Sequence, residues 1–181
     1  MGRIIEYTLI SADGVFEDPA SWGAFSFRDE AYLRDGLGLL QSSGAMLMGR
    51  NMYESSAALW PSRTDPWATR LNAMPKFVFS SRLVTAEWSN TTILRSELVA
   101  GIAQLKSEVD GDIVIWGHGS LAESLWHHRL IDILDLSIHP VLVGRGRSFL
   151  RAGLASDLKL VTTKTFSNIV KLTYEVQPLK A

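Results

Sequence analysis

The sequence predicts a three-layer α-β-α fold in which a mixed, mostly parallel central sheet ends in antiparallel C-terminal strands. Short apolar strands alternate with helical segments over residues 3–128, which favours parallel strands joined by right-handed crossovers. Three strand-like segments then follow residue 132 without a helix between them, which favours antiparallel pairing. The apolar content is 46% in 181 residues, enough for one sizeable core. We therefore expect a single domain over residues 1–181.

The strands are predicted from apolar runs and two-residue periodicity. Residues 3–10 are apolar on both faces of that period, as in a strand covered by helices on both sides. Shorter buried strands are expected at residues 45–48, 76–79 and 113–116. Longer strands are expected at residues 133–143, 158–166 and 168–176.

The helices are predicted from the spacing of leucines and from terminal residues. The first, over residues 29–41, carries its apolar stripe on Leu33, Leu37 and Leu40 and should stop at Gly44. Asp29 and Glu30 lie in its first turn, where the helix dipole favours negative charge. Further helices are expected after Gly49, over residues 96–109, and from Ser120 to about His128.

Composition excludes several classes of function. The chain has no cysteine, which rules out disulfides, thiolate zinc sites and a cysteine nucleophile, and its four histidines show no metal-binding pattern. A net charge of −1 without a basic run argues against nucleic-acid binding. No apolar run approaches the length of a membrane span, and the N-terminus lacks the apolar core of a signal peptide. We expect a cytoplasmic protein that acts on a small molecule.

Three predicted strands end in loops suited to phosphate groups, and ligands of open α/β sheets bind beyond the carboxyl ends of the strands. The first loop, Met48-Gly49-Arg50-Asn51-Met52-Tyr53-Glu54, combines a glycine, an arginine and a helix start, whose free N–H groups attract anions. Asn51 and Glu54 have the spacing of a helix-capping pair. The alternative is an ordinary strand-to-helix turn with Arg50 at the surface.

The other two loops suit different parts of a dinucleotide. Ser80-Ser81-Arg82 offers two hydroxyls and a guanidinium, which suit the 2′-phosphate of NADP, and the alternative is a solvated polar loop. Gly117-His118-Gly119-Ser120-Leu121 lets the backbone approach a diphosphate, and Ser120 with Glu123 predicts a capping box. It is not the Gly-x-Gly-x-x-Gly fingerprint, and the alternative is a tight turn without a ligand.

Five segments in this order resemble the dihydrofolate reductase superfamily, and more closely its riboflavin-biosynthesis reductase branch, which includes stand-alone bacterial proteins. They are the three loops above together with Ser11-Ala12-Asp13-Gly14 and His139-Pro140-Val141-Leu142-Val143-Gly144-Arg145-Gly146. The resemblance spans nearly the whole chain and implies an NADPH-dependent reductase, often a homodimer. It implies that Ala12 and Gly14 border the nicotinamide, that Ser80, Ser81 and Arg82 hold the 2′-phosphate, and that the diphosphate is held by Gly49, Arg50, Gly117, His118, Gly119, Ser120 and Leu121.

The chain departs from the family pattern at three places. Met52 stands where such reductases often carry threonine, which removes a hydroxyl near the cofactor. His118 replaces the second glycine of a Gly-Gly pair; if that bond were cis here, as it is there, it would cost about 2.5–4 kcal/mol. Asp29 and Glu30 lie a turn too early for the substrate-binding carboxylate of folate reductases, which disfavours folate as the substrate.

Candidate catalytic groups are few. Asp13 is adjacent to the expected nicotinamide site and would orient or protonate the substrate; its alternative is an Asp-Gly turn residue. Asp29 and Glu30 are weaker candidates, with N-terminal helix charges as the alternative. Aromatic residues would cover a planar ring, although aromatic side chains more often belong to the core. The expected substrate contacts are Trp22, Phe25, Phe27, Tyr53 and His139.

The leading hypothesis is hydride transfer from NADPH to a pterin-, flavin- or pyrimidine-like heterocycle. A second is a dinucleotide-binding or sensor protein of the same fold without turnover, and a third is a structural dimer with an empty cleft. Cofactor binding separates the third from the others, and substrate-dependent NADPH oxidation separates the first two. Long C-terminal edge strands also favour a homodimer, because an uncovered edge invites pairing.

Overall fold

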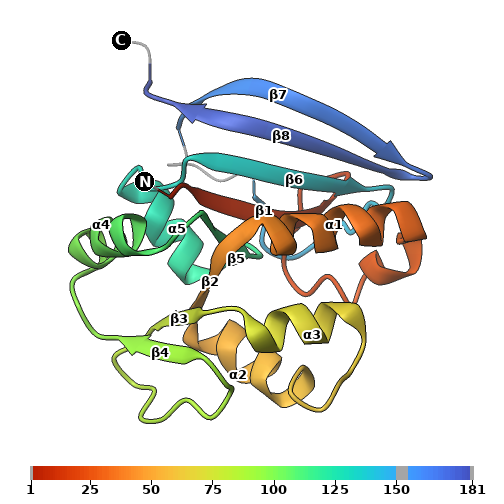
Figure 1. Ribbon diagram of the computed structural model, residues 1–181. Coiled ribbons are helices and arrows are strands. Elements are labelled where there is room, and N and C mark those ends of the chain that lie inside the picture. The colour runs from red at the N-terminus through yellow and green to blue at the C-terminus, as the bar shows by residue number, and fades with distance from the viewer. Residues whose placement is uncertain (1, 150–154, 180–181) are drawn as a thin grey trace.

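The central sheet has eight strands in the order β4-β3-β2-β5-β1-β6-β8-β7 in the computed structural model, which describes residues 2–149 and 155–179 (Figure 1). All pairs from β4 through β6 are parallel, and β8 pairs antiparallel with both β6 and β7. The predicted mixed sheet with an antiparallel C-terminal edge is thereby confirmed. The strands are β1 (Ile4–Ser11), β2 (Ser43–Gly49), β3 (Lys76–Phe79), β4 (Thr91–Leu94), β5 (Asp112–Trp116), β6 (Ile133–His139), β7 (Asp157–Phe166) and β8 (Ile169–Gln177).

Helices cover both faces of the sheet because successive strand residues point to opposite sides. On β1, Ile4 and Ile10 belong to the core under α4 and α5, whereas Tyr7 and Leu9 belong to the core under α1, α2 and α3. The predicted three layers are confirmed. The helices are η1, a short 3-10 helix (Ala24–Phe27), α1 (Glu30–Ser42), α2 (Arg50–Leu59), α3 (Pro66–Ala73), α4 (Leu98–Glu108) and α5 (Ser120–His127).

The buried stripe of α1 shares Leu40 with the predicted stripe, but its other two positions each lie one residue before the predicted Leu33 and Leu37. Tyr32, Gly36 and Leu40 face the core, whereas Leu33 is exposed. Gly36 is buried because α3 packs directly on it, and a Cβ added there would lie only 2.7 Å from the Trp67 ring. The leucine pattern misjudged the stripe because it gave no weight to a tyrosine and a glycine.

Several element boundaries also differ from the prediction. The short elements α3 and β4 were not predicted from the sequence. The strand expected over residues 133–143 ends at His139, since Pro140 has no N–H to donate to a neighbouring strand. Gly44 does not stop α1 but lies within β2, where a side chain would collide with the backbone of Asp110.

A buried ion cluster attaches the C-terminal hairpin to the rest of the fold. Lys171 of β8 lies 2.5 Å from a carboxylate oxygen of Asp35 on α1 and 2.8 Å from one of Asp135 on β6. Asp35 also pairs with Lys164 of β7. Burial lowers the pKa of Lys171, but the two carboxylates outweigh it and raise the pKa, so the lysine stays protonated.

Within residues 2–149 and 155–179, no group of three histidine, aspartate or glutamate side chains is arranged to hold a metal ion. In the same part of the chain, no helix combines the length and the apolar character needed to cross a membrane.

Candidate functional site

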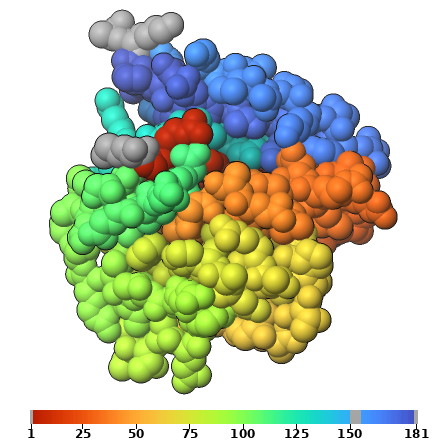
Figure 2. All heavy atoms as spheres, in the orientation of Figure 1, coloured from red at the N-terminus to blue at the C-terminus, as the bar shows by residue number. Residues whose placement is uncertain are grey.

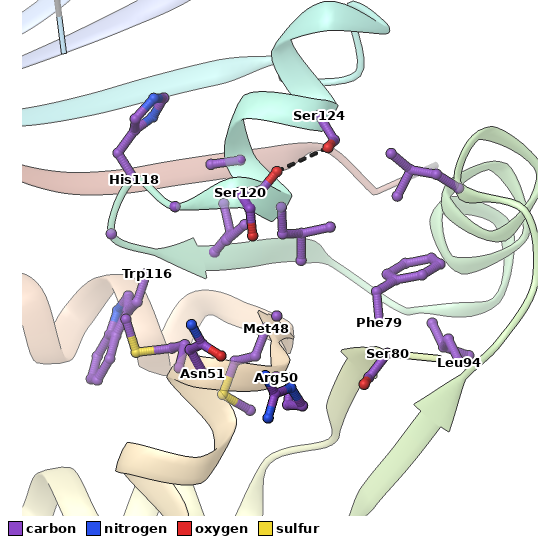
Figure 3. A pocket seen from close by; sticks show the side chains of 18 of the residues that line it. Met48, Arg50, Asn51, Phe79, Ser80, Leu94, Trp116, His118, Ser120 and Ser124 are labelled. Carbon is purple, nitrogen blue, oxygen red and sulfur yellow. Dashed lines mark hydrogen bonds between the residues drawn. The ribbon is translucent and has the colours of Figure 1, made fainter. Parts of the chain in front are cut away.

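A cavity of about 910 Å³ opens where four parallel strands end (Figure 3). Its lining includes the last residue of each strand, which is Gly49 of β2, Phe79 of β3, Leu94 of β4 and Trp116 of β5. These strands are neighbours in the sheet, so the loops that follow them gather around one opening. The three phosphate-suited loops of the sequence therefore come together here.

One wall of this first cavity is the N-terminus of α2. Gly49 occupies the N-cap position and offers no side chain to cap the helix, so the first backbone N–H groups stay available to an anion. The predicted capping pair of Asn51 and Glu54 is wrong, because both lie inside the helix. Glu54 instead forms an ion pair with Arg50, with 3.2 Å between Nη1 and Oε1.

A second uncapped helix, α5, forms the opposite wall. Its N-cap is Gly119, and Ser120 is the first helical residue, so the predicted capping box is also wrong. Glu123 instead accepts a hydrogen bond from the Arg147 guanidinium at 2.6 Å. Gly117 has a positive φ of 72°, which favours glycine, and the described residues contain no cis peptide bond, so the cis bond considered for His118 is absent.

The third wall carries unpaired positive charge. Ser80 Oγ accepts the backbone N–H groups of Arg82 and Leu83 at 3.1 and 2.9 Å and so shapes the turn. The Arg82 guanidinium is exposed and makes no hydrogen bond or ion pair within the described residues. Arg95, just beyond β4, also lines the cavity and donates to the Leu83 carbonyl at 2.8 Å. Arg95 was not predicted from the sequence, although Arg95 and Ser96 offer a guanidinium and a hydroxyl directly after an apolar segment.

His118 anchors its loop from behind the cavity. Its ring turns away from the opening that Arg50 and Ser80 face (Figure 3). Its Nδ1 lies 2.7 Å from Glu6 Oε1, and the other oxygen of Glu6 accepts the indole N–H of Trp126. The Glu6 and His118 side chains are fully buried. A buried pair between β1 and the Gly117–Gly119 turn therefore fixes the turn in place.

A second cavity of about 640 Å³ adjoins the first. The two share five lining residues: Phe16, Pro19, Met52, Trp116 and Gly117. The walls of the second cavity include the aromatic residues Trp60, Trp67, Tyr32 and Phe25, with Arg28 and Arg63 also lining it. A ligand in one cavity would thus reach a ligand in the other at the shared residues.

The aromatic residues expected to contact substrate lie mostly elsewhere. Trp22 packs edge-on against His139, with 5.5 Å between ring centroids, and His139 is fully buried. Tyr53 is buried, and its hydroxyl accepts a backbone N–H. Phe27 packs against the core beneath α1. None of these four lines either cavity, whereas Phe25 lines the second.

Asp13 lies outside both cavities. Its carboxylate accepts the Ser11 hydroxyl at 2.5 Å and the backbone N–H groups of Gly144 and Val143 at 2.7 and 3.1 Å. These hydrogen bonds, that of Ser11 first, lower its pKa to about 2. Asp13 therefore holds the 140–146 loop against the end of β1 as a turn residue.

Four further predicted residues are also placed away from the cavities, namely Asp29, Glu30, Ala12 and Gly14. Asp29 caps α1 by accepting the Tyr32 N–H at 2.7 Å, and Glu30 is exposed and pairs with Arg34 at 3.3 Å. Ala12 and Gly14, expected to border the nicotinamide, line neither cavity. The other ten predicted cofactor positions all line the first cavity.

Replacing Asp13 with alanine should lower the melting temperature and leave nucleotide affinity unchanged, since Asp13 joins two loops without facing a cavity. A lowered pKa means that the stabilisation is complete above the unfolded pKa of about 3.9 and is lost as the pH falls through the folded value. The gap in melting temperature between the wild type and the variant should therefore close as the pH falls from 5 to about 2. A weaker NADPH affinity in the variant would instead place Asp13 in the binding site.

Comparison with known proteins identifies the family of this chain. The family model of the RibD C-terminal domain matches residues 3–172. The uncharacterized protein YyaP of Bacillus subtilis (strain 168) is 29% identical over 143 residues, which are 75% of this chain and 75% of that protein.

Solved structures agree with that match. A putative riboflavin biosynthesis protein from Shewanella sp. PV-4 superposes with a TM-score of 0.75 at 19% identity, covering 98% of this chain and 99% of that one. RibD of Acinetobacter baumannii gives 0.68 at 14% identity, covering 98% of this chain and 58% of the other. The third structure is a diaminohydroxyphosphoribosylaminopyrimidine deaminase/5-amino-6-(5-phosphoribosylamino)uracil reductase from Thermotoga maritima. It superposes with a TM-score of 0.67 at 10% identity, covering 97% of this chain and 56% of that one. The predicted dihydrofolate reductase-like fold is confirmed.

Proposed function

The chain belongs to the RibD C-terminal domain family, and from that premise we propose that it is an NADPH-dependent reductase that transfers a hydride to a pterin-, flavin- or pyrimidine-like ring. The observation that carries this proposal is the pair of adjoining cavities. The first has anion-binding walls, the second has aromatic walls, and they meet at Phe16, Trp116 and Gly117. Such an arrangement suits a dinucleotide beside a planar acceptor.

The chemistry of the first cavity fits NADPH. The uncapped N-termini of α2 and α5 would hold the diphosphate through backbone N–H groups, with Arg50 beside them. The unpaired Arg82 guanidinium and the Ser81 hydroxyl would hold the 2′-phosphate, and Arg95 would add a second charge at that end.

Bound NADPH would supply the hydride, and the protein would supply position and exclusion of water. The acidic residue in the lining of the second cavity is Asp65, which caps α3 and pairs with Arg63 at 2.8 Å. Burial raises its pKa, but the Ala68 N–H and Arg63 outweigh this and lower it, so Asp65 is ionised. The lining of the second cavity therefore offers no protonated carboxylic acid as a proton donor.

Titration with NADPH and NADH tests the proposal, followed through the fluorescence of the six tryptophans. We expect saturable NADPH binding and NADPH oxidation with at least one heterocycle among pterins, flavins and pyrimidines. Binding without oxidation by any acceptor would favour the dinucleotide-binding or sensor alternative. Absence of binding by either nucleotide would refute both and leave only a structural role.

We also propose a homodimer formed through the C-terminal edge of the sheet. Strand β7 lies at that edge and forms an outer surface of the molecule (Figure 2). Its Leu158, Leu160 and Val161 side chains are 43%, 52% and 54% exposed, which is unusual for adjacent apolar residues on an edge strand. Sedimentation velocity should give the mass of two chains, and the mass of one chain would refute this part.

A further inference from the structure

We propose that the second cavity binds a planar aromatic ring that carries one carboxylate, and that Arg28 is the residue that binds the carboxylate. The inference rests on the proposed function and deepens it, because this ring would be the hydride acceptor.

The walls of the cavity are suited to an aromatic ring. The Trp116 ring lies near those of Trp60 and Trp67, with 6.2 and 5.8 Å between ring centroids. Phe25 and Tyr32 add two further aromatic side chains to the lining. The volume of about 640 Å³ lies in the range of small-molecule sites. An aromatic ring would bury its faces against these side chains.

Arg28 is the uncompensated cation of this cavity. Its guanidinium lies 4.1 Å from the Phe25 ring centroid and 5.9 Å from that of Tyr32. It makes no hydrogen bond or ion pair within residues 2–149 and 155–179, and its Nε is buried without a partner. A buried donor without an acceptor is unfavourable, and a ligand that accepts from it removes this cost.

Arg63, the other arginine in the lining, is already neutralised. It pairs with Asp65 at 2.8 Å and lies 4.9 Å from the Trp60 ring centroid. The lining therefore carries one net positive charge, contributed by Arg28. One charge matches a carboxylate better than a phosphate, which carries about −1.5 to −2 at neutral pH. The planar fork of a guanidinium also matches the two oxygens of a carboxylate.

The experiment uses the full chain saturated with NADP⁺ and compares pterin-6-carboxylate with pterin by isothermal titration calorimetry. We expect the carboxylate to bind about tenfold more tightly, the effect of one charged hydrogen-bonded contact. In Arg28→Met this preference should disappear, while pterin itself binds as to the wild type. In the matched control Arg34→Met, which removes an exposed arginine of α1 outside the cavity lining, the preference should persist.

Each outcome bears on a separate claim. Absence of NADPH binding by the wild-type chain would refute the proposed function. Three results, each obtained with normal NADPH binding, would overturn the assignment of Arg28 and leave the cofactor site standing. They are no pterin binding, equal affinity for the two pterins, and a preference for the carboxylate that survives Arg28→Met. A tenfold, Arg28-dependent preference for riboflavin 5′-phosphate over riboflavin, without one for the carboxylate, would also overturn it in favour of a phosphate.

Discussion

Replacement of Glu6 by leucine should lower the free energy of unfolding by about 1–3 kcal/mol for each buried polar group that is left without its hydrogen-bond partner. Glu6 is fully buried and binds both His118 Nδ1 and the Trp126 indole N–H. Leucine fills a similar volume but accepts no hydrogen bond, so both partners would be left unpaired in an apolar surrounding. Urea unfolding at neutral pH measures the effect.

Two matched variants make this result specific. Glu6→Gln keeps one acceptor and one donor at the same position and should cost clearly less than Glu6→Leu. Glu30→Leu removes an exposed glutamate from α1 and should change the stability by less than about 0.5 kcal/mol. Because Glu6 also holds the Gly117–Gly119 turn, NADPH affinity should fall in Glu6→Leu even where the protein is fully folded. Equal stabilities for Glu6→Leu and Glu30→Leu would contradict the role assigned to the buried pair.

Replacement of Arg82 by alanine should weaken NADPH binding at least tenfold, which corresponds to the 1.5–3 kcal/mol of a charged hydrogen bond. The Arg82 guanidinium has no other partner within the described part of the chain, so its loss leaves the protein itself unstrained. NADH, which lacks the 2′-phosphate, should bind the variant and the wild type alike. The measurement is therefore the ratio of the NADPH and NADH dissociation constants, compared between Arg82→Ala and the wild type.

The control for Arg82 is Arg34→Ala, which removes an exposed arginine of α1 and should leave both nucleotides unaffected. Arg95→Ala should have a smaller effect than Arg82→Ala, since part of the Arg95 guanidinium already binds the Leu83 carbonyl. If Arg82→Ala weakened NADPH and NADH equally, the arginine would contact a part common to both nucleotides, and its assignment to the 2′-phosphate would be wrong.

The position of the cofactor cavity could be predicted from the sequence because it depends on strand ends. Gly49, Ser80 and Gly117 each follow an apolar run, and parallel neighbouring strands bring such positions to one edge of the sheet. The capping assignments for Glu54 and Glu123 failed because each helix begins at or before the residue predicted as its cap, so that Asn51 and Ser120 already lie in the helix. Spacing alone does not show that a nearby arginine will compete for the carboxylate.

The second cavity could not be predicted because its walls come from segments without a strong periodic signal. Arg28 follows a four-residue 3-10 helix, and Trp67 lies in α3, which has only eight residues. One signal was available, since Asp65 before Pro66 is a typical helix start. Residues such as Tyr53 and His139 were expected at the site because burial in the core and placement at a cleft favour the same residue types.

The ion cluster on Lys171 has a consequence for folding during synthesis. Asp35 and Asp135 are both in place on α1 and β6 well before residue 171 is made, and domains begin to fold from the N-terminus as the ribosome extends the chain. Until Lys171 leaves the ribosome, Asp135 lacks its lysine partner and Asp35 lacks one of its two, so the like charges of the two carboxylates oppose the docking of β6 beside α1. The native sheet should therefore form only after the last hairpin has emerged, and a ribosome-bound chain halted before that point should remain open to proteases around Asp135.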